Sequence, residues 1–231
     1  LRDDALVVCE PFRQWVIEDN FAGPRPAWER VGVQFVDDVE PWETMKLRVL
    51  NATHSVLAYL GILRGHNTIA EAVQDPELDE ICRAMVLRDV APTTTGGMDA
   101  VGYGNEVRAR FANPALKHTT RQVAMDGSQK LGPRLLGTVR DATDAGGSTD
   151  MLALAVAAWC AFVLAETEAG RALDDPLSAQ LARAGSASDL LAVESIFGSD
   201  LGPTSPFGTQ VVAWTDFLRT NSLGEWKRVL V

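Results

Sequence analysis

The chain has 231 residues, a formal net charge of −10 and an apolar content of 46%, as expected of a globular protein large enough to bury a hydrophobic core. The acidic balance argues against binding to nucleic acid or to anionic membrane surfaces. No apolar run reaches the roughly 20 residues of a membrane-spanning helix, and no signal peptide is visible. The cysteines lack paired spacing, so we expect free thiols in a reducing cytoplasm rather than disulfides or structural zinc: Cys9, Cys82 and Cys160.

The first 40 residues predict a mixed segment. Residues 5–8 and 31–36 are rich in valine and predict two short strands. The Gly-Pro-Arg-Pro sequence at 23–26 predicts a turn between them. The chain begins with leucine directly before an apolar stretch, so we expect a fragment or a processed product.

From Pro41 onward the sequence predicts helices. Pro41 suits a first helical position and Gly61 suits a stop. Further helices are expected over residues 67–90 with a break at 75–76, 105–111, 115–128, 130–143, 150–168, from 174, 188–197 and 207–220. Gly-, Thr- and Pro-rich stretches predict loops at 92–104, 145–148 and 202–206. The predicted fold is therefore mainly α, with a small strand element near the N-terminus.

One predicted helix, within residues 42–54, carries an unusual set of polar side chains. At about 100° per residue, four of them fall within an arc of roughly 140° on one face: Glu43, Lys46, Asn51 and His54. The rest of the helix is mostly Met, Leu, Val and Ala, so we expect this wall to be buried. Because buried polar groups cost free energy unless they are partnered, a bound polar substrate is one way to partner them.

Each of these residues also has an ordinary structural explanation. Lys46 could act as a general base if burial or a nearby cation lowered its pKa, but a lone lysine on a helix is most often solvated. Asn51 and His54 could hold a carbonyl or alkoxide oxygen, and a capping asparagine with a hydrogen-bonded core histidine explains them equally well. Glu43 either forms an i, i+3 ion pair with Lys46 or conducts its proton to solvent.

A second candidate is the Asp-Gly-Ser-Gln-Lys sequence at 126–130. It either marks a helix boundary, with Gly127 as a break and Ser128 as a cap, or places Lys130 against a polyhydroxy or carboxylate substrate. Spacing alone favours the boundary.

Several signatures are absent from the sequence. No G-x-G-x-x-G follows a strand, so no dinucleotide fingerprint is present, and there is no P-loop, H-E-x-x-H or G-x-S-x-G motif. The three histidines lack metal-ligand spacing and predict no metal site: His54, His66 and His118.

Seven sequence blocks, in this order, resemble the polyol-specific long-chain dehydrogenases, the mannitol 2-dehydrogenase family that includes fructuronate reductase (D-mannonate oxidoreductase) and tagaturonate reductase. The blocks are QWVIED at 14–19, GVQFVDDV at 32–39, MKLR at 45–48, NATHS at 51–55, AYLG at 58–61, RFANPA at 110–115 and MDGSQK at 125–130. The match is to the family's C-terminal substrate domain, a multi-helix fold of the 6-phosphogluconate-dehydrogenase C-terminal type. The resemblance implies that 41–231 is this domain and that 1–40 leads from a Rossmann domain missing from the sequence.

The resemblance also implies a metal-independent mechanism with NAD or NADP. It implies that Lys46 is the general base, that Asn51 and His54 polarise the reacting oxygen, and that Glu43 gates proton release. Lys130 falls where the family has a substrate-contacting lysine. Mannitol dehydrogenases have an arginine eight positions before this lysine, whereas this chain has Gln122 there and Arg121 next to it. The sequence at 122–130 is closer to that of the hexuronate reductases.

We therefore expect the substrate domain of an NAD(P)-dependent oxidoreductase that interconverts a hexitol or aldonate with its ketose or ketouronate. Its expected partners are a small sugar alcohol or sugar acid and an N-terminal Rossmann domain, with no nucleic acid and no membrane. The alternative is a stand-alone, non-catalytic helical module for sugar-acid binding or protein assembly.

Overall fold

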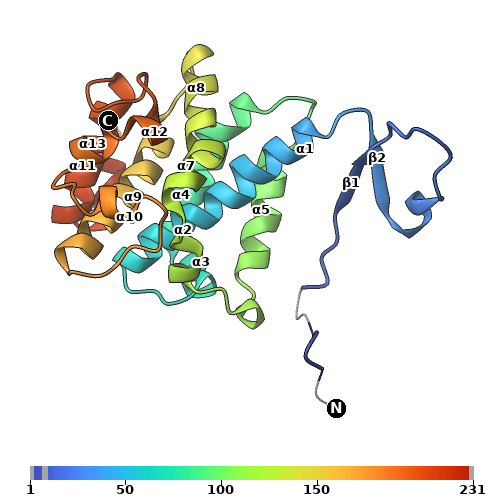
Figure 1. The fold of residues 1–231 in the computed structure, drawn as a ribbon, viewed down its shortest axis with the longest axis horizontal. Coiled ribbons are helices and arrows are strands. Elements are labelled where there is room, and N and C mark those ends of the chain that lie inside the picture. Colours follow the sequence, from blue (N-terminus) through green and yellow to red (C-terminus); the bar gives the residue numbers. More distant parts are fainter. Residues whose placement is uncertain (1–2, 7–9, 229–231) are drawn as a thin grey trace.

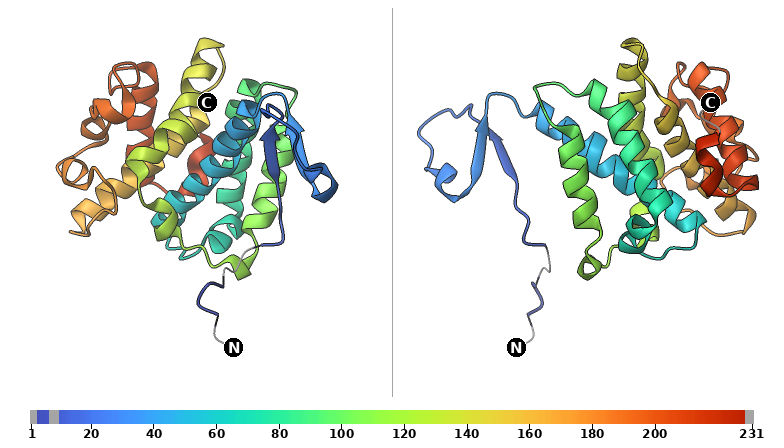
Figure 2. Two further views of the ribbon diagram at one scale, coloured as in Figure 1. Left: turned by 45° about the vertical axis from the view of Figure 1, so that its right-hand side comes forward. Right: turned by 180° about the vertical axis from the view of Figure 1, so that it is seen from behind.

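The computed structural model describes residues 3–6 and 10–228, and helices dominate it (Figure 1). The strands β1 (Trp15–Glu18) and β2 (Val33–Val36) pair in parallel as a small sheet beside the helical body (Figure 2). The expected mainly α class with a small N-terminal strand element is confirmed.

The strand predictions near the N-terminus need correction. β2 begins two residues later than expected because Val31 ends the 3-10 helix η1 (Trp28–Val31) and Gly32 follows with a left-handed φ of 95°. β1 was not expected as a strand. In the other predicted strand, at 5–8, Ala5 lies in a turn and Leu6 is not in a strand, whereas Val7 and Val8 lie outside the described residues.

The helical region forms one continuous bundle. Its first half contains α1 (Glu40–Met45), η2 (Lys46–Asn51), α2 (Ala52–Leu63), α3 (Ile69–Gln74), α4 (Pro76–Met85), η3 (Val86–Val90), η4 (Ala91–Thr93), α5 (Ala100–Phe111) and η5 (Pro114–Leu116). Its second half contains α6 (Thr120–Ala124), α7 (Gly127–Leu131), η6 (Gly132–Leu136), α8 (Gly137–Asp144), α9 (Asp150–Glu168), α10 (Ser178–Leu181), α11 (Ala187–Leu191), α12 (Glu194–Phe197), α13 (Pro206–Thr220) and η7 (Leu223–Arg228). Within the described residues, η2, η3 and η6 are π-helical.

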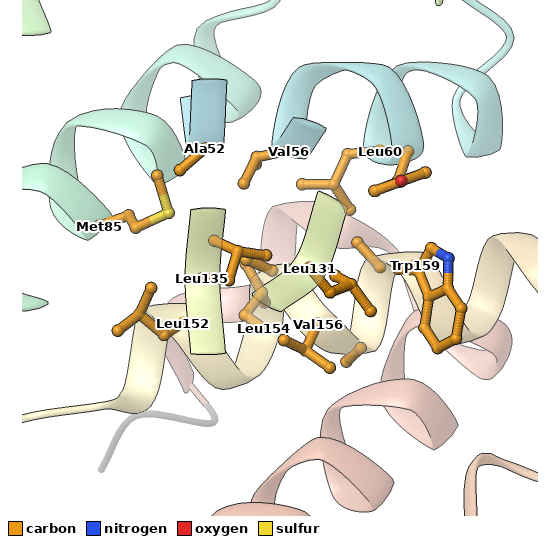
Figure 3. Packing of buried hydrophobic residues seen from close by; sticks show 14 of the residues in the cluster. Ala52, Val56, Leu60, Met85, Leu131, Leu135, Leu152, Leu154, Val156 and Trp159 are labelled. Atoms are coloured by element: carbon orange, nitrogen blue, oxygen red, sulfur yellow. The ribbon is translucent and has the colours of Figure 1, made fainter. Parts of the chain in front are cut away.

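The core is built around α9, which packs against α2 on one side and α13 on the other. Side chains of α7 and η6 lie between α2 and α9, with Leu131 and Leu135 facing Val56 and Leu154 (Figure 3). Among the described residues, α9 is the one helix long and apolar enough to cross a membrane, and 83% of its most apolar 18-residue window is buried inside the protein. Its nearly uniform burial explains why it has apolar residues on every side.

The start of α9 is capped by a residue from another helix. The carboxylate of Asp89, in η3, accepts hydrogen bonds from the backbone N–H groups of Met151 at 2.8 Å and Leu152 at 2.9 Å. The Ser148 hydroxyl donates to the same carboxylate at 2.8 Å. These bonds satisfy N–H groups that a helix leaves unpaired at its N-terminus, and they fasten η3 to the central helix.

Two glycines predicted as helix ends lie inside or at the start of helices. Gly61 continues α2 because it lets the helix approach its neighbours: an added Cβ would lie 3.1 Å from both Ala72 and Thr120. The stop falls at Gly65, which has a φ of 83°. Gly127 begins α7 after Asp126, which adopts a left-handed φ of 54°.

The predicted loop at 92–104 is also too long. α5 begins at Ala100, because the Asp99 side chain caps it through the Gly102 N–H at 2.8 Å. The loop signal from Thr and Gly therefore hid the first turn of a helix.

Candidate functional site

The four polar residues of the predicted wall lie on one uninterrupted helical segment made of α1, η2 and α2. Lys46 begins its π-helical part and Asn51 ends it. A π-helix bonds residue i to residue i+5, so Asn51 follows Lys46 by one π turn rather than by a turn and a half of α-helix. His54 lies one α turn after Asn51. The π-helical segment thus brings Lys46 closer in angle to Asn51 and His54 than a regular helix would.

The expectation that this wall is buried is only half right. Asn51 and His54 are half-buried, but Glu43 and Lys46 are exposed. Lys46 has no hydrogen bond or ion pair to any described residue, so of the two alternatives for Glu43 the ion pair with Lys46 does not form. The wall therefore runs from a buried end at His54 to an open end at Lys46.

At the buried end, the His54 imidazole stacks on Phe111 with ring centroids 4.6 Å apart, and the His118 ring lies 5.8 Å away. Its Nε2 atom is buried and has no hydrogen-bond partner among the described residues. Burial, helped by His118, Arg134 and Lys130, lowers the pKa of His54 to about 3. The imidazole is therefore neutral at physiological pH, with an unsatisfied polar atom available to an oxygen ligand.

Lys130 joins this cluster from α7. Its ammonium group donates to the carbonyl of Met125 and, at 3.3 Å, to that of Val123. Asp126 lies 4.0 Å away. Burial and then the nearby Arg134 lower the pKa of Lys130. Lys130 is therefore close enough to His54 to lower the pKa of that imidazole, and two of its donor positions are used by backbone carbonyls.

Arg134 is a site residue that sequence reasoning missed. Its Nη1 donates to the Ser55 hydroxyl at 2.8 Å and to the Asn51 carbonyl at 3.4 Å. The sequence offered one indication of its role: Arg134 follows Lys130 by four residues, and residues i and i+4 share a helix face. The sequence assigned His118 no site role, and no local pattern around it indicates its position beside His54.

Arg121 and Gln122 are not brought to this cluster. The Arg121 guanidinium pairs with Glu166, with a shortest N–O distance of 2.9 Å, and Arg171 pairs with the same carboxylate at 2.6 Å. Both cations lower the pKa of Glu166 to about 2, Arg171 more strongly. Arg121 and Gln122 line a cavity of about 240 Å³ together with Trp159 and other residues of α9. None of the four wall residues lines this cavity, and neither does Lys130. A substrate role for Arg121 and Gln122 stays a prediction.

Among the described residues, no glycine-rich dinucleotide fingerprint follows a strand. β1 and β2 are joined by a segment containing a 3-10 helix, with no glycine-rich turn opening into a helix where a pyrophosphate could bind. No group of three or more His, Cys, Asp or Glu that could hold a metal ion occurs in residues 3–6 and 10–228. The donors at His54, Lys130 and Arg134 instead suit the oxygens of a small polar molecule.

Comparison with known proteins identifies relatives of the whole segment. Residues 38–217 match the family described as the mannitol dehydrogenase C-terminal domain. D-mannonate oxidoreductase of Escherichia coli is 46% identical over 222 residues, which cover 91% of this chain and 46% of the relative. The uncharacterized oxidoreductase YeiQ of the same organism is 46% identical over 233 residues, which cover 95% and 47%.

Among solved structures, the ternary complex of Pseudomonas fluorescens mannitol 2-dehydrogenase with NAD and D-mannitol superposes with a TM-score of 0.84. Its sequence is 37% identical, and the match covers 96% of this chain and 47% of that chain. A substrate-free D-sorbitol dehydrogenase matches with a TM-score of 0.80 at 31% identity, over 90% of this chain and 45% of that chain. The chain spans about half the length of the relatives it matches.

Proposed function

Because the chain belongs to the mannitol dehydrogenase C-terminal domain family, we propose that it is the substrate-binding and catalytic half of an NAD(P)-dependent oxidoreductase. The reaction interconverts a hexitol or aldonate with the corresponding ketose or ketouronate. The observation that carries the proposal is the buried, unpartnered Nε2 of His54 beside the donors of Lys130 and Arg134. Buried polar atoms without partners are rare in native proteins, and a substrate oxygen is a natural partner.

In this proposal, His54 and Asn51 hold the oxygen of the reacting carbon. The neutral imidazole can donate one hydrogen bond from Nε2, and the carboxamide of Asn51 can donate another. Donors aimed at this oxygen stabilise the negative charge that develops on it while the carbonyl and the alcohol interconvert. The stacking of His54 on Phe111 holds the imidazole in place.

Lys46 takes the proton in the oxidation direction. Oxidation of a secondary alcohol removes the hydroxyl proton and a hydride from the same carbon, leaving a carbonyl. The amine of Lys46 receives the proton and passes it to solvent, with the exposed Glu43 one turn away as the acceptor on that route. The nicotinamide, when bound, supplies the hydride acceptor.

The open end of the wall suggests where the other half of the enzyme binds. Glu43 and Lys46 are exposed in this chain, and the relatives are about twice its length. We propose that 41–231 forms the substrate domain, that 1–40 connects it to an N-terminal Rossmann domain, and that this Rossmann domain would hold the cofactor. A cytoplasmic location accords with its buried free thiols, Cys82 and Cys160.

The experiment measures oxidation of D-mannitol and D-mannonate, with NAD and with NADP, by the complete enzyme and its Lys46→Met variant. Removing a general base costs about 10²- to 10⁴-fold in turnover, so we expect kcat to fall by that factor while the melting temperature is unchanged. The control is Lys227→Met, which removes an exposed ion pair between Lys227 in η7 and Glu80 in α4. Turnover of Lys46→Met close to that of the wild type would refute the assigned role. Oxidation of neither substrate by the wild type would refute the proposed function.

A further inference from the structure

Arg134 differs from the other half-buried arginines of the described residues because it has no carboxylate partner. Each of the others has a carboxylate oxygen within 4.0 Å: Arg25, Arg48, Arg108, Arg110 and Arg140. Arg134 instead donates to a hydroxyl and a carbonyl, both neutral. A partly desolvated charge without a counter-ion is costly, and among the half-buried arginines that the structure describes Arg134 alone carries this cost, beside the proposed substrate oxygen site.

Lys130 adds positive charge beside Arg134, and the acids of this region, Asp126, Asp174 and Asp175, act on Lys130 and not on Arg134. Arg134 and Lys130 each lower the pKa of His54, and Arg134 lowers that of Lys130. Burial lowers the pKa of Arg134 itself, and no carboxylate among the described residues acts on it. Because the whole chain has a net charge of −10, the pair of cations at Lys130 and Arg134 is a local feature. Such a pair can bind an anion.

The hydrogen bonds of Arg134 use one nitrogen of its guanidinium group and leave the other two without a partner among the described residues. Nη1 is held by Ser55 and by the Asn51 carbonyl, whereas Nε and Nη2 donate to no described residue. The planar fork of a guanidinium matches a carboxylate in bidentate fashion. Because the same residue, Asn51, bonds to Arg134 through its backbone and is proposed to bind substrate through its side chain, an anion on Arg134 would belong to the same substrate molecule.

We propose that Arg134 is the specificity-determining residue that binds the carboxylate of a sugar acid, so that this enzyme acts on an aldonate and its ketouronate in preference to a neutral hexitol and its ketose. The inference rests on the proposed function. It narrows the substrate class within that function and assigns Arg134 a contact with substrate.

The test compares kcat/KM of the complete enzyme for three probes that share one carbon skeleton: D-mannonate, D-mannitol and D-mannitol 1-phosphate. The wild type should prefer D-mannonate. Arg134→Gln should lower kcat/KM for D-mannonate by about 10- to 100-fold, the loss expected for a hydrogen bond to a charged group. For D-mannitol the same variant should change kcat/KM by less than about threefold. Arg183→Gln, at an exposed arginine without an ion pair, is the matched control.

A purely structural role for Arg134 would lower kcat/KM for all three probes alike, and that outcome would overturn the inference. A wild-type preference for D-mannitol or for the phosphate would overturn it as well. If Arg134→Gln does not fold, Arg134→Lys decides: it keeps the charge but loses the fork, so the loss should be smaller and again confined to D-mannonate. If the wild type oxidises none of the probes, the proposed function itself fails. If it oxidises them, but the ratio of kcat/KM for D-mannonate to that for D-mannitol is the same in Arg134→Gln as in the wild type, the inference alone fails.

Discussion

At the scale of single residues, the His54 imidazole makes a testable contribution to the pH dependence of stability. Its pKa is about 3 in the folded protein, lowered mainly by burial and also by His118, Arg134 and Lys130, against an ordinary value of 6.5. Between these two pH values the unfolded chain binds the extra proton, so stability rises with pH and the contribution is complete above about pH 6.5. We expect this group to remove about 2 kcal/mol of the free energy of unfolding when the pH falls from 7 to 5.

The variant His54→Gln isolates that contribution. Urea unfolding at pH 5, 6 and 7 should show a free energy of unfolding that falls less steeply with acid in His54→Gln than in the wild type. The lowered carboxylate pKa values elsewhere, such as that of Glu166, are common to both proteins and cancel in the comparison. Equal pH slopes, or a His54 ring proton whose NMR shift titrates near pH 6.5, would show that the imidazole is not desolvated as described.

Residue identities were the part of the site that the sequence predicted best. Asn51, His54 and Lys130 were named from local spacing and from the family resemblance. Asn51 and His54 lie on one helical segment, and Lys130 acts on His54 electrostatically. Arg134 could have been found from its i+4 relation to Lys130, but its significance could not. The property that distinguishes it, a missing carboxylate partner, depends on contacts with η2 and α2 that no local pattern specifies.

At the scale of elements, two nearby glycines should respond in opposite ways to alanine. A Cβ on Gly127, at the start of α7, would lie 2.4 Å from Trp159 Nε1 and 2.9 Å from the Tyr59 hydroxyl, both on buried side chains. A Cβ on Gly132, at the start of η6, would meet no atom within 4 Å. We expect Gly127→Ala to lower the free energy of unfolding by about 1–3 kcal/mol through overpacking. Gly132→Ala should raise it by up to about 1 kcal/mol through helix propensity.

Both variants can be compared by urea unfolding under the same conditions. Both variants add one methyl group to a glycine, at positions five residues apart. Comparing them therefore separates the effect of side-chain packing on stability from that of helix propensity. If Gly127→Ala were as stable as Gly132→Ala, the close packing of α7 on Trp159 would be wrong.

The carboxylate that caps α9 offers a second prediction at this scale. Asp89→Ala leaves the N–H groups of Met151 and Leu152 without their acceptor in a buried position. Losing the cap and leaving buried donors unpaired should cost about 2–3 kcal/mol. Asp89→Asn retains one acceptor oxygen and should lose less. Thermal unfolding followed by circular dichroism measures the series, and equal melting temperatures for the three proteins would contradict the capping role.

Helices with a strong pattern were predicted with accurate ends, and irregular ones were not. α9 matches its predicted bounds of 150–168 because Asp150 and the long apolar run are both local signals. The π-helical segment η2 was predicted as regular helix, since its bonding follows from packing against α5 and η6 rather than from its own residues. Likewise Gly61 read as a stop because its close approach to Ala72 and Thr120 involves helices distant in the chain.

At the scale of the whole molecule, the fold class could be predicted from the sequence, but the local distribution of charge and the exposure of the site residues could not. The net charge of −10 correctly describes a surface rich in acidic residues and gives no sign of the cationic cluster at Lys130 and Arg134. The fold class followed from the dominance of helical periodicity. The exposure of Lys46 and Glu43 did not, because the apolar neighbours of these residues in the sequence predicted a buried wall.

The same exposure leads to a prediction about the isolated chain. With no glycine-rich turn between a strand and a helix in the described residues, and with the Lys46 end of the wall open, the chain should not hold a nicotinamide dinucleotide by itself. Calorimetric titration with NAD or NADP should give no measurable heat at ligand concentrations up to about 1 mM, where a binding free energy of about −4 kcal/mol would be detected. The complete enzyme, titrated in parallel, should bind one of the two dinucleotides. Tight dinucleotide binding by the isolated chain would mean that the cofactor site lies within these 231 residues, and the proposed Rossmann partner would then be unnecessary.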